Sequence, residues 1–81
     1  MEPYIGQIIL FAGNFVPMGW ALCNGATIHI KKNEALFSLL GTTYGGDGTT
    51  SFHLPNMKGL ASGAAEINYL IAIKGFYPNR G

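Results

Sequence analysis

The side chains most capable of chemistry in this chain are two histidines, one cysteine and four carboxylates. His29 and His53 lie far apart in the sequence, and no His-x-His or Cys-x-x-Cys pair accompanies them, so the spacing does not indicate a metal site. Cys23 lies in an apolar segment, where a buried and unreactive thiol is expected. We predict no enzymatic activity and no cofactor, because no two carboxylates lie close together in the sequence as a general acid and base; they are Glu2, Glu34, Asp47 and Glu66.

The glycine-rich segment at residues 44–48, Tyr-Gly-Gly-Asp-Gly, is the best candidate for a ligand-binding loop. It is not a phosphate-binding loop, because no Gly-Lys-Ser or Gly-Lys-Thr follows and the segment leaves a predicted helix instead of entering one. A tight turn whose glycines adopt positive φ is the simpler interpretation. If the protein binds a ligand, Tyr44 offers a stacking face, Asp47 an acceptor for sugar hydroxyls, and His53 a donor from the next strand.

The periodicity of apolar residues predicts several short strands. Residues 5–12 are apolar on both faces apart from Gln7, which predicts a strand covered on both sides. The pair Asn24-Gly25 between two apolar runs predicts a β-hairpin with a type I′ turn. The other predicted segments are the hairpin strands at 20–23 and 26–30, a loop at 41–50, strands at 50–54 and 67–74, a featureless stretch at 60–66 and a fraying tail at 75–81.

One short helix is predicted at residues 32–40. Its leucines and phenylalanine cover most of its circumference, so we expect the helix to be buried. Gly41 is suited to end the helix in a left-handed conformation. Lys31 and Asn33 are the alternative residues for its N-terminal cap, of which lysine is the poorer.

Composition indicates a single domain, residues 1–81, that does not stand alone. Hydrophobic residues make up 48% of the chain and charged residues 11%, against about 25% charged in an average domain. So short a chain has a marginal core, and one cysteine cannot form a disulfide within it. We therefore expect some apolar surface to contact another copy or a partner.

Charge and hydropathy exclude two other classes of partner. The net charge is +1, which gives no basis for electrostatic binding of nucleic acid or anionic lipid. No apolar run approaches the roughly 18 residues of a transmembrane helix, so membrane insertion is not expected. The first residues lack the basic segment of a signal peptide.

The sequence resembles the phage tail collar domain, which also occurs in bacterial proteins of the microcystin-dependent type. Seven motifs carry the resemblance: Gly6-Gln7-Ile8, Phe11-Ala12-Gly13-Asn14-Phe15, Pro17-Met18-Gly19-Trp20, Cys23-Asn24-Gly25, Ala35-Leu36-Phe37-Ser38-Leu39-Leu40-Gly41, Tyr44-Gly45-Gly46-Asp47-Gly48 and Phe52-His53-Leu54-Pro55-Asn56-Met57-Lys58-Gly59. The segment at residues 67–75 is similar to the closing strand of those proteins.

The resemblance implies a small α+β, strand-rich domain that assembles as an interlocked homotrimer at the tip of a tail fibre. Its implied partners are a fibre shaft or tail protein and a cell-surface receptor, often a glycan, and its implied location is a virion tail, a phage-tail-like particle or an extracellular fibre tip. The alternative is a structural trimerisation or capping module without a ligand. Three chains could also gather three copies of one histidine around an axis. Family members commonly carry a long insertion where this chain has only residues 60–66, and a shaft usually precedes the domain, so we expect a minimal tip or an excised domain.

Overall fold

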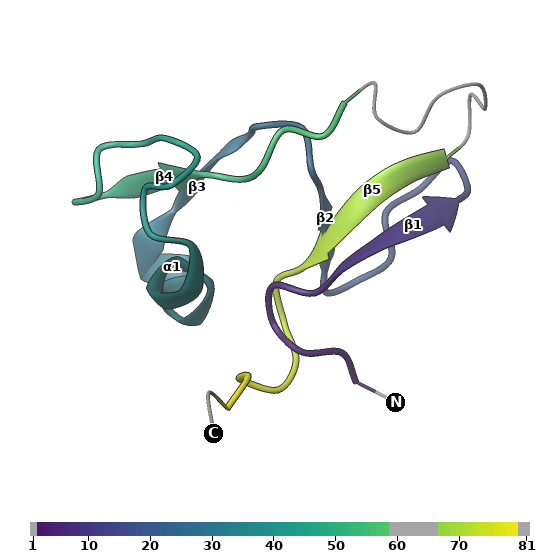
Figure 1. Ribbon diagram of the computed structural model, residues 1–81, viewed down its shortest axis with the longest axis horizontal. Coiled ribbons are helices and arrows are strands. Elements are labelled where there is room, and N and C mark those ends of the chain that lie inside the picture. The colour runs from purple at the N-terminus through teal and green to yellow at the C-terminus, as the bar shows by residue number, and fades with distance from the viewer. Residues whose placement is uncertain (1, 59–66, 80–81) are drawn as a thin grey trace.

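The protein forms two small antiparallel sheets and one short α-helix. The computed structural model describes residues 2–58 and 67–79. The three-stranded sheet lies to the right in Figure 1, whereas the two-stranded sheet and the helix lie to the left. This is the α+β, strand-rich arrangement that the sequence predicts. Along the chain the elements are β1 (Ile8–Ala12), β2 (Trp20–Leu22), β3 (Thr27–His29), a 3₁₀ helix (Ile30–Lys32), α1 (Glu34–Leu40), β4 (Ser51–His53) and β5 (Ile67–Ala72).

Strand β5 is the centre of the larger sheet, with β1 and β2 antiparallel on either side. Leu70 and Ile71 are adjacent and therefore point to opposite faces of the sheet, yet both are buried. A central strand is covered on both faces, which explains the nearly continuous apolar sequence of β5. The strand predicted at residues 67–74 is confirmed, although it ends two residues earlier.

Strands β3 and β4 form a separate two-stranded sheet in which Ile28 lies opposite Phe52. Phe52 is fully buried, whereas its neighbours Ser51 and His53 are only half-buried. The alternation gives the sheet one apolar face toward the core and one polar face. The strand predicted at residues 50–54 is confirmed with slightly narrower bounds.

The hairpin predicted around Asn24 and Gly25 is wrong. The two segments that flank the pair belong to different sheets, because β2 pairs with β5 and β3 pairs with β4. A type I′ turn needs positive φ at both central residues, but of these two only Gly25 has it, at 77°. The Asn24 Oδ1 atom instead accepts a hydrogen bond of 3.1 Å from the N–H of Ala26, and Asn24 forms an isolated bridge with Asn56. The pair therefore carries the chain from one sheet to the other.

The core joins the two sheets to the helix. The rings of Phe37 on α1 and Phe52 on β4 lie 5.2 Å apart in a tilted arrangement. Residues from separate elements meet there, so each sheet depends on the other for burial of its apolar face. The buried residues of this cluster are Cys23, Leu36, Phe52, Leu54 and Ile71.

Helix α1 begins at Glu34, two residues later than predicted, and follows the 3₁₀ helix. Asn33 is its N-terminal cap residue, one of the two expected alternatives, but its side chain forms no capping hydrogen bond. Gly41 ends the helix with the expected positive φ, 57°, but its ψ of −145° lies outside the left-handed helical conformation that was predicted. Burial around most of the helix is wrong for the single chain: Leu36 is fully buried, whereas Glu34, Ala35 and Ser38 are exposed.

Strand β1 is shorter than predicted, and one of its faces is open in the single chain. Ile8 and Leu10 are 39% and 56% exposed, so the expected cover on both sides is absent here. Ile8 lies opposite Ile71 in the sheet and therefore shares its face. The face of the sheet that packs on the core at Ile71 is thus exposed to solvent where β1 extends it, at Ile8 and Leu10.

The C-terminal segment is held in place as far as Tyr77, so the predicted fraying from residue 75 is wrong for this part. Tyr4 and Phe76 form a parallel bridge, with Phe76 N–H donating to the Pro3 carbonyl at 2.9 Å and Ile5 N–H donating to the Phe76 carbonyl at 2.8 Å. Both ends of the described chain lie at the bottom of Figure 1, the C-terminal end to the left of the N-terminal one. The N-terminal segment therefore supplies the partner that fixes the tail.

Two further expectations concern the segment at residues 60–66 and the membrane. The segment at residues 60–66 lies outside the described residues. Within residues 2–58 and 67–79, no helix is long and apolar enough to cross a membrane.

Candidate functional site

The glycine loop, residues 41–50, is organised by the carboxylate of Asp47. Its Oδ1 atom accepts hydrogen bonds from the backbone N–H groups of Thr49, Thr50 and Ser51, at 2.8, 2.8 and 3.0 Å. Its Oδ2 atom accepts a fourth bond, of 2.8 Å, from the hydroxyl of Thr50. One side chain thus satisfies the backbone donors that lead into β4, in the manner of an Asx turn.

These hydrogen bonds also fix the charge of Asp47. The donors stabilise the ionised carboxylate, first of all the N–H of Ser51, then those of Thr50 and Thr49 and the Thr50 hydroxyl. They hold the pKa of the Asp47 carboxyl well below its usual range. Both oxygens already have donors, so the structure gives Asp47 a task in building the loop. Its role as a sugar acceptor stays a prediction.

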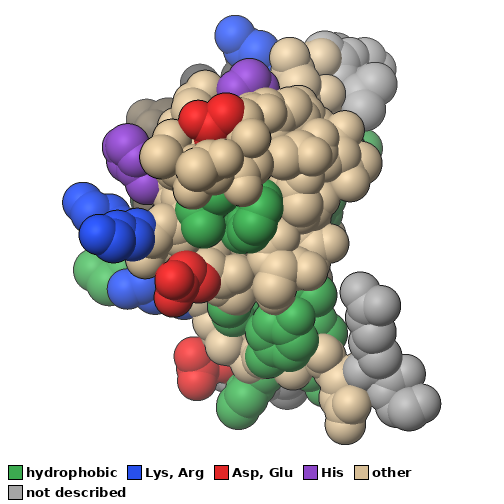
Figure 2. All heavy atoms as spheres, turned by 90° about the vertical axis from the view of Figure 1, so that its left-hand side faces the viewer, with side chains coloured by type: hydrophobic (Ala, Val, Ile, Leu, Met, Phe, Trp, Pro, Cys, Tyr) green, Lys and Arg blue, Asp and Glu red, His purple; other side chains and the backbone are tan. Residues whose placement is uncertain are grey.

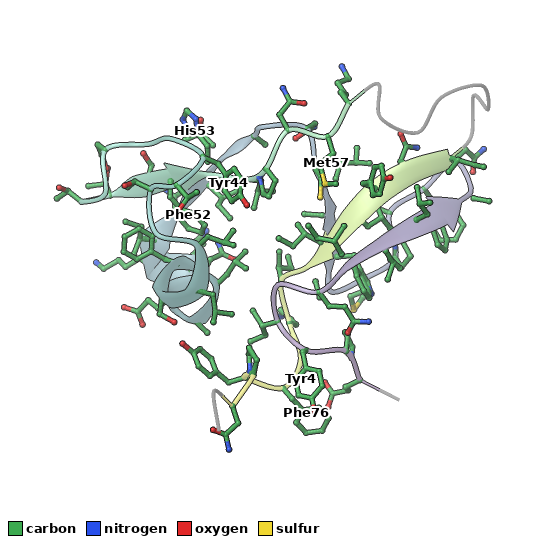
Figure 3. The ribbon with its side chains drawn as sticks, viewed as in Figure 1. Tyr4, Tyr44, Phe52, His53, Met57 and Phe76 are labelled. Carbon is green, nitrogen blue, oxygen red and sulfur yellow. The ribbon has the colours of Figure 1, made fainter. Side chains whose placement is uncertain are left out.

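Tyr44 and His53 lie at the two ends of the same loop-and-strand unit (Figure 3). Tyr44 is 48% exposed, which leaves part of its ring open to a ligand. The N–H of His53 donates to the Gly45 carbonyl at 3.1 Å. A Cβ added at Gly45 would lie 2.6 Å from His53 Nδ1, so the absence of a side chain there lets the imidazole pack on the loop. The loop therefore brings the residue after Tyr44 into contact with His53.

The strand register places both histidines on one polar face, which the sequence analysis missed. Thr27 lies opposite His53, and His29 lies opposite Ser51. Paired residues point to the same side of a sheet, so these four side chains share the face that is turned away from Phe52. The signal was present in the sequence as two polar-apolar-polar triplets, Thr27–His29 and Ser51–His53, but local sequence does not show that they pair.

The thiol and the other titratable groups are not gathered into a reactive centre in the described part of the chain. Cys23 is 3% exposed, and burial raises the pKa of its thiol, which disfavours the reactive thiolate. The described residues contain no group of three or more His, Cys, Asp or Glu side chains that could hold a metal ion. Cys23 is therefore a core residue, as the sequence predicts.

A hollow of about 540 Å³ lies beside the glycine loop, and sequence reasoning did not find it. One wall is the segment at residues 29–34 and the other is Thr49 and Thr50 at the end of the loop. The N–H of Ile30 donates to the Thr50 carbonyl at 3.0 Å and joins the two walls. Basic and imidazole side chains gather on this side of the molecule in Figure 2. The lining residues are His29, Ile30, Lys31, Lys32, Glu34, Thr49 and Thr50.

Comparison with known families identifies the fold that carries this loop. The Phage Tail Collar Domain matches residues 6–62, which is 57 of the 81 residues and includes β1 to β4, α1 and the glycine loop. A search of curated proteins finds no match. The family is a structural one of phage tail fibres and implies a location in the phage tail or another part of the virion. The resemblance seen in the motifs is confirmed: the chain belongs to the phage tail collar domain family.

Proposed function

We propose that this chain is an assembly module of a tail fibre that associates with two further copies of itself. The observation that carries the proposal is the balance of apolar burial. Among the described residues, seven apolar residues are buried, whereas nine large hydrophobic side chains are exposed. A monomer rarely leaves so much apolar surface in water, and such surfaces usually contact another protein. Three-fold association is the state that the family resemblance implies.

The exposed apolar side chains that matter most extend from β1 into the loop that follows it. Leu10 continues the core face along an edge strand, and Met18 in the loop is 98% exposed. An exposed edge strand with apolar side chains is a template for pairing with another chain. We place the self-association surface here; its members are Ile8, Leu10, Phe15, Val16 and Met18.

Light scattering coupled to size-exclusion chromatography tests the proposal. The parent protein is expected at about 26 kDa, three times the 8.7 kDa of one chain. Leu10→Asp introduces a charge on the proposed surface and should shift the mass toward the monomer. Thr43→Asp, a similar change at an exposed position after α1, should leave the mass unchanged. A monodisperse monomer of the parent at micromolar concentration would contradict the proposal.

A second function, recognition of a cell-surface glycan, is supported by the state of Tyr44. Its ring is about half exposed on a loop that Asp47 fixes through three backbone N–H groups and the Thr50 hydroxyl. A rigid loop loses little entropy on binding, and three copies on one tip gain by avidity. His53 would add a donor beside the ring.

A glycan array with the intact assembly tests this second function. Tyr44→Ala should abolish binding while Tyr44→Phe, which keeps the stacking ring, should retain most of it. Equal binding by Tyr44→Ala would place any glycan site elsewhere. Absence of binding by the parent protein, with the trimer intact, would favour a capping module without a ligand.

A further inference from the structure

The hollow between residues 29–34 and the end of the glycine loop concentrates charge in a molecule that has little. The whole chain contains nine charged residues, and three of them, Lys31, Lys32 and Glu34, line this hollow together with His29. Ile30 adds an apolar side chain and Thr49 a hydroxyl-bearing one. A partly apolar concavity with a few convergent polar groups is the usual form of a small-molecule site, and 540 Å³ falls within the usual range of about 300–1,000 Å³.

The walls of the hollow are fixed by hydrogen bonds. Asp47 holds the backbone N–H groups of Thr49 and Thr50, and the N–H of Ile30 donates to the Thr50 carbonyl. On the opposite wall, Asn33 Nδ2 donates to the His29 carbonyl at 3.0 Å. A ligand would therefore enter a shape that is already formed, which reduces the entropic cost of binding.

The charges select an anionic ligand. Lys31 and Lys32 supply two ammonium groups against the single carboxylate of Glu34, and ammonium groups form charge-assisted hydrogen bonds with carboxylates and phosphates. A bare inorganic anion would leave most of the volume unfilled. A sugar ring fills it better, with hydroxyls that can pair with Glu34 and Thr49 and an apolar side that can lie on Ile30.

We propose that this hollow binds an acidic saccharide, a sugar that carries a carboxylate or a phosphate group. The site goes beyond the assembly role proposed above and uses none of Tyr44, Asp47 or His53 as a direct contact. Lysines are depleted at the centre of protein interfaces, so the hollow is expected to stay open when the apolar surface of β1 is covered.

Titration of the full chain followed by backbone amide NMR tests the site. The probes are 3′-sialyllactose, glucose 6-phosphate, neutral lactose and inorganic phosphate. The two acidic sugars separate the carboxylate from the phosphate source, and binding of either supports the proposal if the amides of residues 29–34 and 49–50 shift. Lactose should bind at least about tenfold more weakly, because it lacks the charge-assisted hydrogen bonds. The proposal is overturned if lactose binds equally well, or if inorganic phosphate binds as tightly as glucose 6-phosphate.

Substitutions of the lining residues test which charges contribute to binding of the acidic sugar. Replacing both lysines, Lys31→Gln with Lys32→Gln, should raise the Kd for the acidic sugar about tenfold or more, whereas Lys74→Gln, at an exposed lysine outside the hollow, should leave it within about twofold. Glu34→Gln should lower the Kd, since it removes a like charge. An unchanged Kd in the double variant, with the mass and fold of the parent, would refute the site. Light scattering on the same samples reports separately on the assembly proposal.

Discussion

The Oδ1 atom of Asp47 accepts a hydrogen bond of 2.8 Å from the backbone N–H of Thr50, at the point where the glycine loop turns into β4. The Thr50 carbonyl in turn accepts from the N–H of Ile30, so one short path of hydrogen bonds joins the loop to the segment before α1. An aspartate in an exposed glycine-rich loop suggests a ligand contact. Its geometry shows that it first builds the loop that a ligand would meet.

The stability of the protein should depend on the charge of Asp47. Folding lowers the pKa of this carboxyl, so its contribution is complete above the usual value of 3.8 and is lost as the pH falls below that value. Asp47→Ala should therefore lower the melting temperature at pH 7, and the gap between variant and parent should narrow at pH 3. Thermal unfolding followed by circular dichroism at both pH values measures this.

The control for this prediction is Glu34→Ala, which removes an exposed carboxylate on α1. Both variants therefore change the net charge of the chain by the same amount. Its melting temperature at pH 7 should remain close to that of the parent. A gap for Asp47→Ala that is as large at pH 3 as at pH 7 would show that the carboxylate charge is not the stabilising feature.

Among the leucines of α1, Leu36 should contribute most to the free energy of unfolding. Leu36 is 1% exposed and lies in the core cluster, so Leu36→Ala should cost about 2–5 kcal/mol of unfolding free energy. Leu40 is only half-buried, and Leu40→Ala should cost clearly less. Chemical denaturation measures both, and equal costs would mean that the core is not centred on Leu36.

Gly25 should resist substitution although no hairpin forms there. Its φ is +77°, and an added Cβ would lie 3.3 Å from the Cβ of Asn56. Gly25→Val should therefore cost about 1–3 kcal/mol from backbone strain alone. Ala26→Val, at the exposed neighbouring position without positive φ, is the matched control and should be nearly neutral. Indistinguishable unfolding curves for the two variants would contradict this explanation.

The contrast between Gly25 and the helix shows what sequence could and could not predict. The helix, its end at Gly41 and the loop after it follow from local propensity, and each lies within two residues of its predicted place. The hairpin failed because strand pairing here is non-local: β2 pairs with a strand that begins at Ile67, and β3 with one that begins at Ser51. An Asn-Gly pair can also end a strand when the asparagine side chain accepts a hydrogen bond from the backbone two residues later, as Asn24 does from the N–H of Ala26.

The same limit applies to the candidate site. Local composition singled out the glycine loop, and the structure does bring Tyr44 and His53 into one loop-and-strand unit through Gly45. Local composition could not reveal that His29 shares a face with His53, because that depends on the register of β3 with β4. Nor could local composition reveal the hollow, because residues 35–48 separate its two walls along the chain, and these include all of α1 after Glu34.

The last prediction concerns the contact that ties α1 to the C-terminal segment, where Ser38 Oγ and Tyr77 OH lie 2.6 Å apart. The Ser38 hydroxyl has a single proton and donates it to the Ala35 carbonyl at 2.7 Å, so Tyr77 must be the donor to Ser38. Tyr77→Phe and Ser38→Ala should then share one coupling energy of about 0.5–1.5 kcal/mol in a double-mutant cycle. Additive costs would show that the two hydroxyls do not interact in solution.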